Sequence, residues 1–171
     1  MIPTISRGSF KEKPAMALKK FTDRALRVIC LASQEAERHG HLAIGTGHIL
    51  VALLNEGNGV AANIMQRAGL SIVSLREALL RVNPLRVDLD NRSCRLPKTV
   101  SVELAVKLAF MEMQTREQDA IGTEHLLLGL LGAVDGSAVK MLNALNVSPN
   151  SLIEGIQRIF PKSASKPAKT A

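Results

Sequence analysis

Four histidines and two glutamates are the residues of this chain whose types and spacing best suit chemistry. His48 and His125 each lie two positions after a glycine–threonine pair, and His39 and His41 are alternate residues further upstream. Imidazoles can act as general bases or bind zinc. No third zinc ligand stands at a convincing spacing, and a histidine just inside a capped helix more often packs or caps. We therefore expect structural roles for His48 and His125.

Glu35 and Glu112 occupy equivalent places in the two halves of the chain. Paired carboxylates support acid–base catalysis where they approach each other, but we expect these two to face solvent in separate halves. The chain contains no Gly-x-x-x-x-Gly-Lys-Ser/Thr phosphate loop and no Gly-x-Ser-x-Gly nucleophile motif. The sequence predicts a protein that is not an enzyme, with no catalytic residue, metal site or cofactor.

An internal repeat determines which elements must position these side chains. Residues 43–54 return 77 positions later as residues 120–131, with eight identical pairs. The same offset, without a gap, pairs Thr22 with Thr99. Repeats of this kind indicate a duplicated supersecondary unit. Each half carries apolar residues at helical spacing between capping residues and glycines, which predicts an all-α fold: a pseudo-twofold tandem repeat of two four-helix units, about eight helices in all.

The repeat also predicts how the chain is organised. One domain is expected over 21–160, between two basic ends of low apolar content. The expected segments are a flexible arm (1–20), repeat one (21–82), a polar connector (83–98), repeat two (99–160) and a disordered tail (161–171).

The net charge of +7 is confined to the ends of the chain. Residues 1–20 carry +4 and residues 162–171 carry +3, whereas residues 21–161 sum to zero. Nucleic-acid binding needs a clustered basic face, so we expect no nucleic-acid partner. No apolar run approaches the length of a membrane span, and we expect no membrane partner.

The predicted core is aliphatic, because the chain has no tryptophan or tyrosine and only four phenylalanines. Cys30 lies among apolar residues and is interpreted as a small buried hydrophobe, sharing no metal or redox spacing with Cys94. Four methionines are likewise interpreted as core: Met65, Met111, Met113 and Met141.

The order of these motifs resembles the N-terminal double-repeat domain of the Clp AAA+ unfoldases, most closely the ClpC type. The resemblance covers about 21–160, and its Gly-Thr-Glu-His segments are specific. It implies a non-catalytic helical domain that receives substrates and adaptors for an ATP-driven ring, here without the motor, and we expect a stand-alone short protein. The motifs that carry it are residues 21–25, 38–41, 44–50 and 55–62.

In ClpC-type domains of some bacteria the two repeats bind phosphoarginine, a degradation mark. The resemblance implies a phosphate at a helix N-terminus behind Thr22 or Thr99 and a guanidinium on the glutamate of the Gly-Thr-Glu-His motif. Repeat two keeps that carboxylate at Glu124, whereas repeat one has Gly47. We therefore expect a site at Thr99 and Glu124 and a weak or dead one at Thr22 and Gly47. A first-turn carboxylate also stabilises a helix without any ligand.

The resemblance leaves several functions open. The leading hypothesis is a binding module that recruits substrates, docks adaptors or occupies a site on a Clp unfoldase or protease core. A second is a decoy that sequesters substrates or ligands independently of the protease, and a third is a helical DNA-binding regulator, which the neutral core argues against. We expect a cytoplasmic location, or an organelle stroma if the basic arm is a targeting segment.

Overall fold

The computed structural model describes residues 20–84 and 96–161. Nearly all of the expected arm and tail, the middle of the connector and Cys94 lie outside these ranges. The described residues form eight helices and two isolated β-bridges. The helices are α2 (Asp23–Arg38), α3 (Thr46–Glu56), α4 (Val60–Arg67), α5 (Ile72–Val82), α6 (Val100–Thr115), α7 (Thr123–Gly132), α8 (Ser137–Ala144) and α9 (Pro149–Ile159).

Local signals in the sequence explain where these helices begin and end. The Thr22 hydroxyl accepts the Ala25 amide at 3.2 Å, and the Thr99 hydroxyl accepts the Val102 amide at 3.4 Å, so α2 and α6 start on equivalent caps. Gly57 ends α3 in the left-handed region, with φ 79°. The prediction of two four-helix units in an all-α fold is confirmed.

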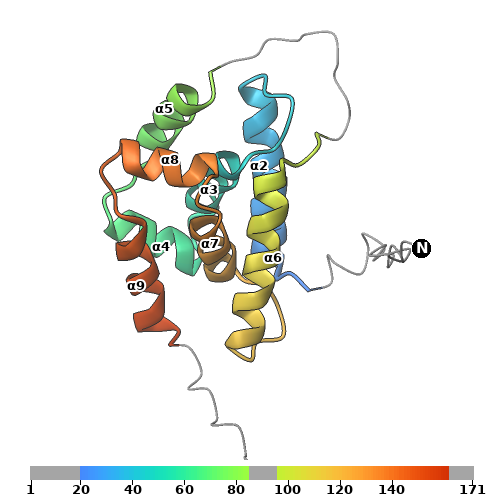
Figure 1. The fold of residues 1–171 in the computed structure, drawn as a ribbon, viewed down its shortest axis with the longest axis vertical. Helices are drawn as coiled ribbons and strands as arrows, with labels where there is room; N and C mark the ends of the chain where they lie inside the picture. The colour runs from blue at the N-terminus through green and yellow to red at the C-terminus, as the bar shows by residue number, and fades with distance from the viewer. Residues whose placement is uncertain (1–19, 85–95, 162–171) are drawn as a thin grey trace, which may run out of the picture.

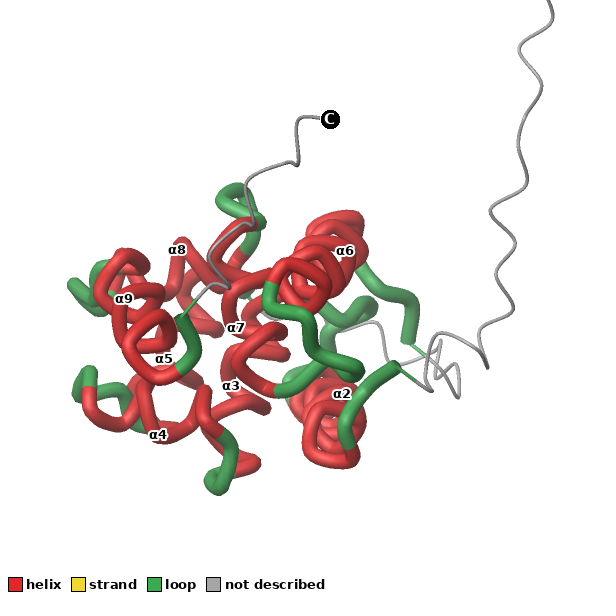
Figure 2. The backbone as a smooth tube through the Cα atoms, turned by 90° about the horizontal axis from the view of Figure 1, so that it is seen from below, coloured by secondary structure: helices red, strands yellow, loops and turns green. Residues whose placement is uncertain are grey.

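The two units interlock in three layers. Figures 1 and 2 show α3 and α7 at the centre, with α2 and α6 packed against them on one side and α4, α5, α8 and α9 on the other. In the outer layer α4 packs on α9, and α5 packs on α8. Each of these pairs joins one helix from each repeat, so neither half closes its core alone.

The core is aliphatic, as predicted, but two residues assigned to it are exposed. Met65 and Met141 are fully buried and Met113 is nearly so. Met111 is 59% exposed on the outer face of α6, so its assignment to the core is wrong. Cys30 is also exposed, on α2. In both places the spacing of apolar residues correctly predicts a helix. The face of each helix that packs on its neighbours is narrower than the run of apolar residues, so Met111 and Cys30 lie outside it.

Candidate functional site

Two extended segments cross from one repeat to the other and bring helix starts together. The residue before Thr22 forms a bridge with Ile121, and the Thr22 amide donates to the Ile121 carbonyl at 3.0 Å. On the other side the Thr99 amide donates to the Ile44 carbonyl, also at 3.0 Å. The N-terminus of α2 therefore meets that of α7, and the N-terminus of α6 meets that of α3. Two pseudo-equivalent junctions of helix starts result, each built from both repeats. The first, at α2, α4 and α7, is an open cleft, and the second, at α3, α6 and α8, is called the sealed cleft below.

The first cleft is open and has a volume of about 380 Å³. Its walls come from the starts of α2, α4 and α7. Glu124 lies on the α7 wall and is 9% exposed, with its Oε1 atom 3.4 Å from Nδ1 of His125. Arg24 on the α2 wall donates a hydrogen bond to the Asn58 carbonyl. The lining residues are Thr22, Asp23, Arg24, Gly59, Val60, Gly122, Thr123 and Glu124.

A buried carboxylate lies behind the wall of this cleft. Glu56 is only 7% exposed, and within the described residues neither of its carboxylate oxygens has a hydrogen-bond partner. A Cβ atom placed on Gly59 would lie 2.9 Å from Glu56 Oε2 and 2.6 Å from Thr123 Oγ1. Gly59 and Thr123 both line the cleft. A buried carboxylate without a partner is costly, so a cationic group bound here would relieve that cost.

The second cleft is sealed by its own hydroxyl groups. The Ser137 hydroxyl accepts the Gly47 amide at 2.8 Å, and the Thr46 hydroxyl accepts the Ala138 amide at 3.1 Å. These bonds satisfy helix N-terminal amides that a ligand could otherwise use. A Cβ atom on Gly47 would lie 2.6 Å from Met141 Sδ. The place of the Glu124 side chain is therefore filled in this cleft.

The acidic groups of the open cleft have no acidic counterpart in the sealed one. At the repeat offset of 77, Asp23 corresponds to Val100, Glu56 to Ala133 and Glu124 to Gly47. Val60, which lines the open cleft, likewise corresponds to the sealing residue Ser137. The acidic residues are therefore particular to the open cleft and are not a feature that both repeats share.

This arrangement corrects the pairing expected from the sequence. Glu124 lines a cleft with Thr22 and not with Thr99, whose amide donates to the Ile44 carbonyl just before α3. Glu124 instead faces Thr22, and Gly47 lies on the side of Thr99. Of the four residues singled out, Thr22 and Glu124 line the open cleft, and binding of phosphoarginine at any of them stays a prediction. The prediction paired them within a repeat because the crossing of the extended segments depends on long-range contacts.

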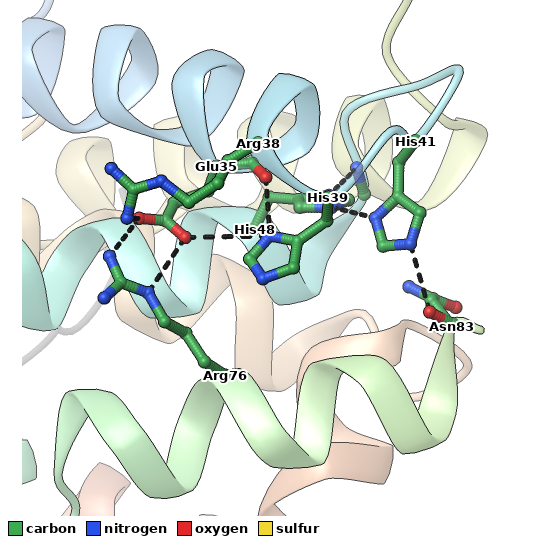
Figure 3. Close-up of polar contacts among 8 residues, drawn as sticks. Glu35, Arg38, His39, His41, His48, Arg76 and Asn83 are labelled. Atoms are coloured by element: carbon green, nitrogen blue, oxygen red, sulfur yellow. Dashed lines mark hydrogen bonds and ion pairs between the residues drawn. The ribbon is translucent and has the colours of Figure 1, made fainter. Parts of the chain in front are cut away.

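A chain of buried hydrogen bonds joins α3 to the end of α5 through two histidines (Figure 3). His48 Nδ1 accepts the Gly45 amide at 2.9 Å, which leaves its Nε2–H to donate to His41 Nδ1 at 2.7 Å. His41 Nε2–H then donates to the Asn83 carbonyl at 3.0 Å. The chain is complete only when both imidazoles are neutral. Burial lowers the pKa of His48 to about 4, and burial also lowers the pKa of His41.

Glu35 is buried beside this chain, so the expectation that it faces solvent is wrong. Its side chain is 2% exposed, and it accepts from Arg76 Nε at 3.1 Å and also from Arg76 Nη2 (Figure 3). Burial alone would raise the pKa of Glu35, but the hydrogen bonds and charge of Arg76 lower it overall. Sequence reasoning missed this pair because Arg76 comes from a different helix.

In the second half, a permanently charged arginine donates a hydrogen bond to the equivalent helix end, that of α9. Arg116 donates to the carbonyl of Phe160, which corresponds to Asn83, and lies 3.3 Å from Glu112. His125 caps α7 as His48 caps α3, with Nδ1 accepting the Gly122 amide at 3.0 Å. The capping role expected for both histidines is thus present. Burial lowers the pKa of His125. In the first half, by contrast, the donor to the equivalent carbonyl, that of Asn83, is the titratable imidazole of His41.

The described residues contain no cluster of three or more His, Cys, Asp or Glu side chains able to hold a metal ion. Within the same ranges, no single helix is long and apolar enough to cross a membrane. Only α7 and α8 taken together reach that length and composition, and they are bent by 86°.

Comparison with known proteins identifies the repeat. The sequence profile of the Clp repeat (R) N-terminal domain matches residues 20–89 and 98–170. The chain belongs to this family. The Clp repeat chain is 37% identical over 145 residues to the Bacillus subtilis negative regulator of genetic competence ClpC/MecB, covering 85% of this chain and 18% of that protein. It is 32% identical over 145 residues to the rice chloroplastic chaperone ClpC1, covering 85% and 16%.

Solved structures agree with this assignment. The N-terminal domain of ClpD from Arabidopsis thaliana matches with a TM-score of 0.70 at 26% identity, over 83% of this chain and 98% of that one. The ClpV N-domain from Vibrio cholerae matches in fold, with a TM-score of 0.66 at 18% identity, over 89% and 92%.

The Clp repeat chain spans less than a fifth of the length of these curated relatives. Clp N-domains are non-catalytic, protein-binding modules that serve substrates or adaptors in Clp systems.

Proposed function

We propose that this chain is a protein-binding module of a Clp chaperone or protease system that captures substrate or adaptor segments through an arginine-type side chain. The open cleft between Thr22 and Glu124 would hold the guanidinium. The observation that carries the proposal is an open cleft lined by Glu124 and backed by the buried Glu56, whose carboxylate has no hydrogen-bond partner among the described residues. Charge-assisted bonds from a guanidinium fork suit two carboxylates at different depths.

A phosphorylated arginine is the form to test first. The phosphate would lie toward the N-termini of α2 and α4, where backbone amides and the helix dipoles favour an anion. Arg24 adds a positive charge on the same wall, and Asp23 opposes it. The balance between these groups decides whether the cleft prefers phosphoarginine or unmodified arginine.

The test is calorimetric titration of phosphoarginine, arginine and inorganic phosphate into the purified chain. Binding at one site, lost in Glu124→Gln and weakened at least about tenfold in Glu56→Gln, is the expected result. Glu103→Gln removes an exposed carboxylate in the first turn of α6 and serves as the control that keeps binding. Absence of binding by the unaltered chain would reject the guanidinium site.

The partner is tested separately, with purified Clp unfoldase, Clp protease core and adaptors. Saturable binding to one of these supports a module of the Clp complex. The ClpV N-domain, which shares this fold, forms a complex with VipB peptide, and that peptide capture is the mode proposed here. Binding of marked substrate without any Clp component would favour the decoy function instead. The site of action would be the cytoplasm, or an organelle stroma, as for the chloroplastic relatives.

A further inference from the structure

A groove runs between α4 and α9, away from the acidic cleft. It has a volume of about 310 Å³. Its floor is apolar: Ile64 and Leu152 are buried, and Ile159 at the rim is 49% exposed. One arginine from each helix, Arg67 on α4 and Arg158 on α9, lines the same groove. The groove thus combines an apolar floor with two cations.

A glycine in the middle of α9 keeps the groove clear. Gly155 lines it, and a Cβ atom there would lie 3.1 Å from Ile64 Cγ2. Glycine inside a helix costs about 1 kcal/mol relative to alanine. A Cβ atom at this position would require Ile64 to shift by a few tenths of an ångström, so glycine suits the close approach of α9 to α4. The equivalent residue on α5 is Ala78.

The two arginines carry charge that the described residues do not neutralise. Both Arg67 and Arg158 are exposed, and neither has an ion pair within the described ranges, whereas Arg76 and Arg116 are each paired with a glutamate. The charge is also particular to this groove. In the equivalent pair of helices, α8 and α5, Arg67 is replaced by Ala144.

We propose that the α4–α9 groove docks a short segment of a partner protein in which apolar side chains alternate with carboxylates. The apolar side chains would cover Ile64 and Ile159, and the carboxylates would bind Arg67 and Arg158. Nucleic acid is a poorer match, because it needs a broad basic face, and the charges of residues 21–161 sum to zero.

The groove lies at the opposite end of α4 from the acidic cleft. Helix α4 begins at Val60, which lines the cleft, and ends at Arg67, which lines the groove, so its eight residues separate the two sites by about 12 Å. Failure of one site therefore leaves the other testable. A binding partner can also engage the groove without carrying an arginine.

The experiment is a 1H–15N NMR titration of the full chain with a synthetic peptide, acetyl-Gly-Ser-Leu-Glu-Leu-Glu-Leu-Glu-Ser-Gly-amide. The amides of α4 and α9 should shift, and the double variant Arg67→Glu, Arg158→Glu should weaken binding at least about tenfold. Arg81→Glu changes the residue equivalent to Arg158 and is the matched control, which should bind normally. Circular dichroism confirms that each variant is folded.

Four results with peptides would overturn the proposal. They are no shifts at millimolar peptide, shifts confined to other helices, equal binding of a peptide with lysine in place of glutamate, and equal loss in Arg81→Glu. A single-stranded oligonucleotide that produces the same shifts more strongly would assign the groove to nucleic acid and reject the protein segment.

Discussion

Acidification should destabilise the fold through His48. The side chain is 2% exposed, and burial lowers its pKa from 6.5 to about 4. Between these values the unfolded chain binds a proton that the folded chain does not, so stability falls as the pH falls. The shift corresponds to about 3 kcal/mol in total, and about 2 kcal/mol of it is lost between pH 7 and pH 5. The lowered pKa of His41 adds in the same direction.

The assay is urea unfolding at pH 7, 6 and 5, followed by helical circular dichroism, because the chain has no tryptophan or tyrosine. His48→Asn keeps an acceptor near the Gly45 amide but removes the titrating group. Its loss of stability between pH 7 and pH 5 should be smaller by about 2 kcal/mol. His39→Gln leaves the Gly45–His48–His41 chain in place and should retain the full pH dependence.

The unfolding measurements are compared only at or above pH 5, because protonation of Glu35 also changes the stability at lower pH. Its pKa is lowered from 4.5, so the stability it contributes is complete above that value and is lost as the pH falls through the lower, folded-state value. If the unaltered chain and His48→Asn lose stability in parallel between pH 7 and pH 5, the argument from His48 burial is refuted.

Three further changes probe other parts of the structure. Arg76→Ala should lower the free energy of unfolding in urea by about 2 kcal/mol, because it removes the main partner of buried Glu35. The loss should be smaller than for a fully buried pair, because the Arg76 side chain is itself 31% exposed. An unchanged midpoint would contradict the pairing. Gly47→Glu should lower stability by about 3 kcal/mol or more without creating a second arginine site, because Met141 fills the space; a calorimetric stoichiometry of two would refute this. Cys30 should react with a thiol reagent in the folded chain, because it is exposed; protection until urea is added would show that it is buried.

The helices could be predicted from sequence because their signals are local. Thr22 and Thr99 cap the helices that follow them, and Gly57 ends another, whatever the distant parts of the chain do. The internal repeat then extended each local prediction to its partner. The packing of α4 on α9 and of α5 on α8 could not be predicted in this way. A repeat predicts the helices of each copy, but it does not predict which helices of the other copy they contact.

The site shows the same division between local and long-range information. Glu124 and Gly47 differ in sequence, and that difference does distinguish the two clefts. Sequence reasoning missed Glu56 as a site residue, because an acidic residue at a helix end normally faces solvent. The signal that could have found it is the comparison at the repeat offset, where Ala133 replaces it. The partners of Glu35 and His41 required the fold, since Arg76 and Asn83 are more than forty residues away.

The difference between the two clefts follows from how each satisfies its polar groups. In the sealed cleft, hydroxyls of Thr46 and Ser137 accept from the helix-start amides, and Ala133 and Gly47 stand at the positions equivalent to Glu56 and Glu124. At the open cleft Val60 provides no hydroxyl, and Glu56 is buried with no hydrogen-bond partner in the part of the chain that the structure describes. Such groups destabilise the unliganded fold. The cationic ligand proposed above would remove this cost by pairing with Glu56 on binding.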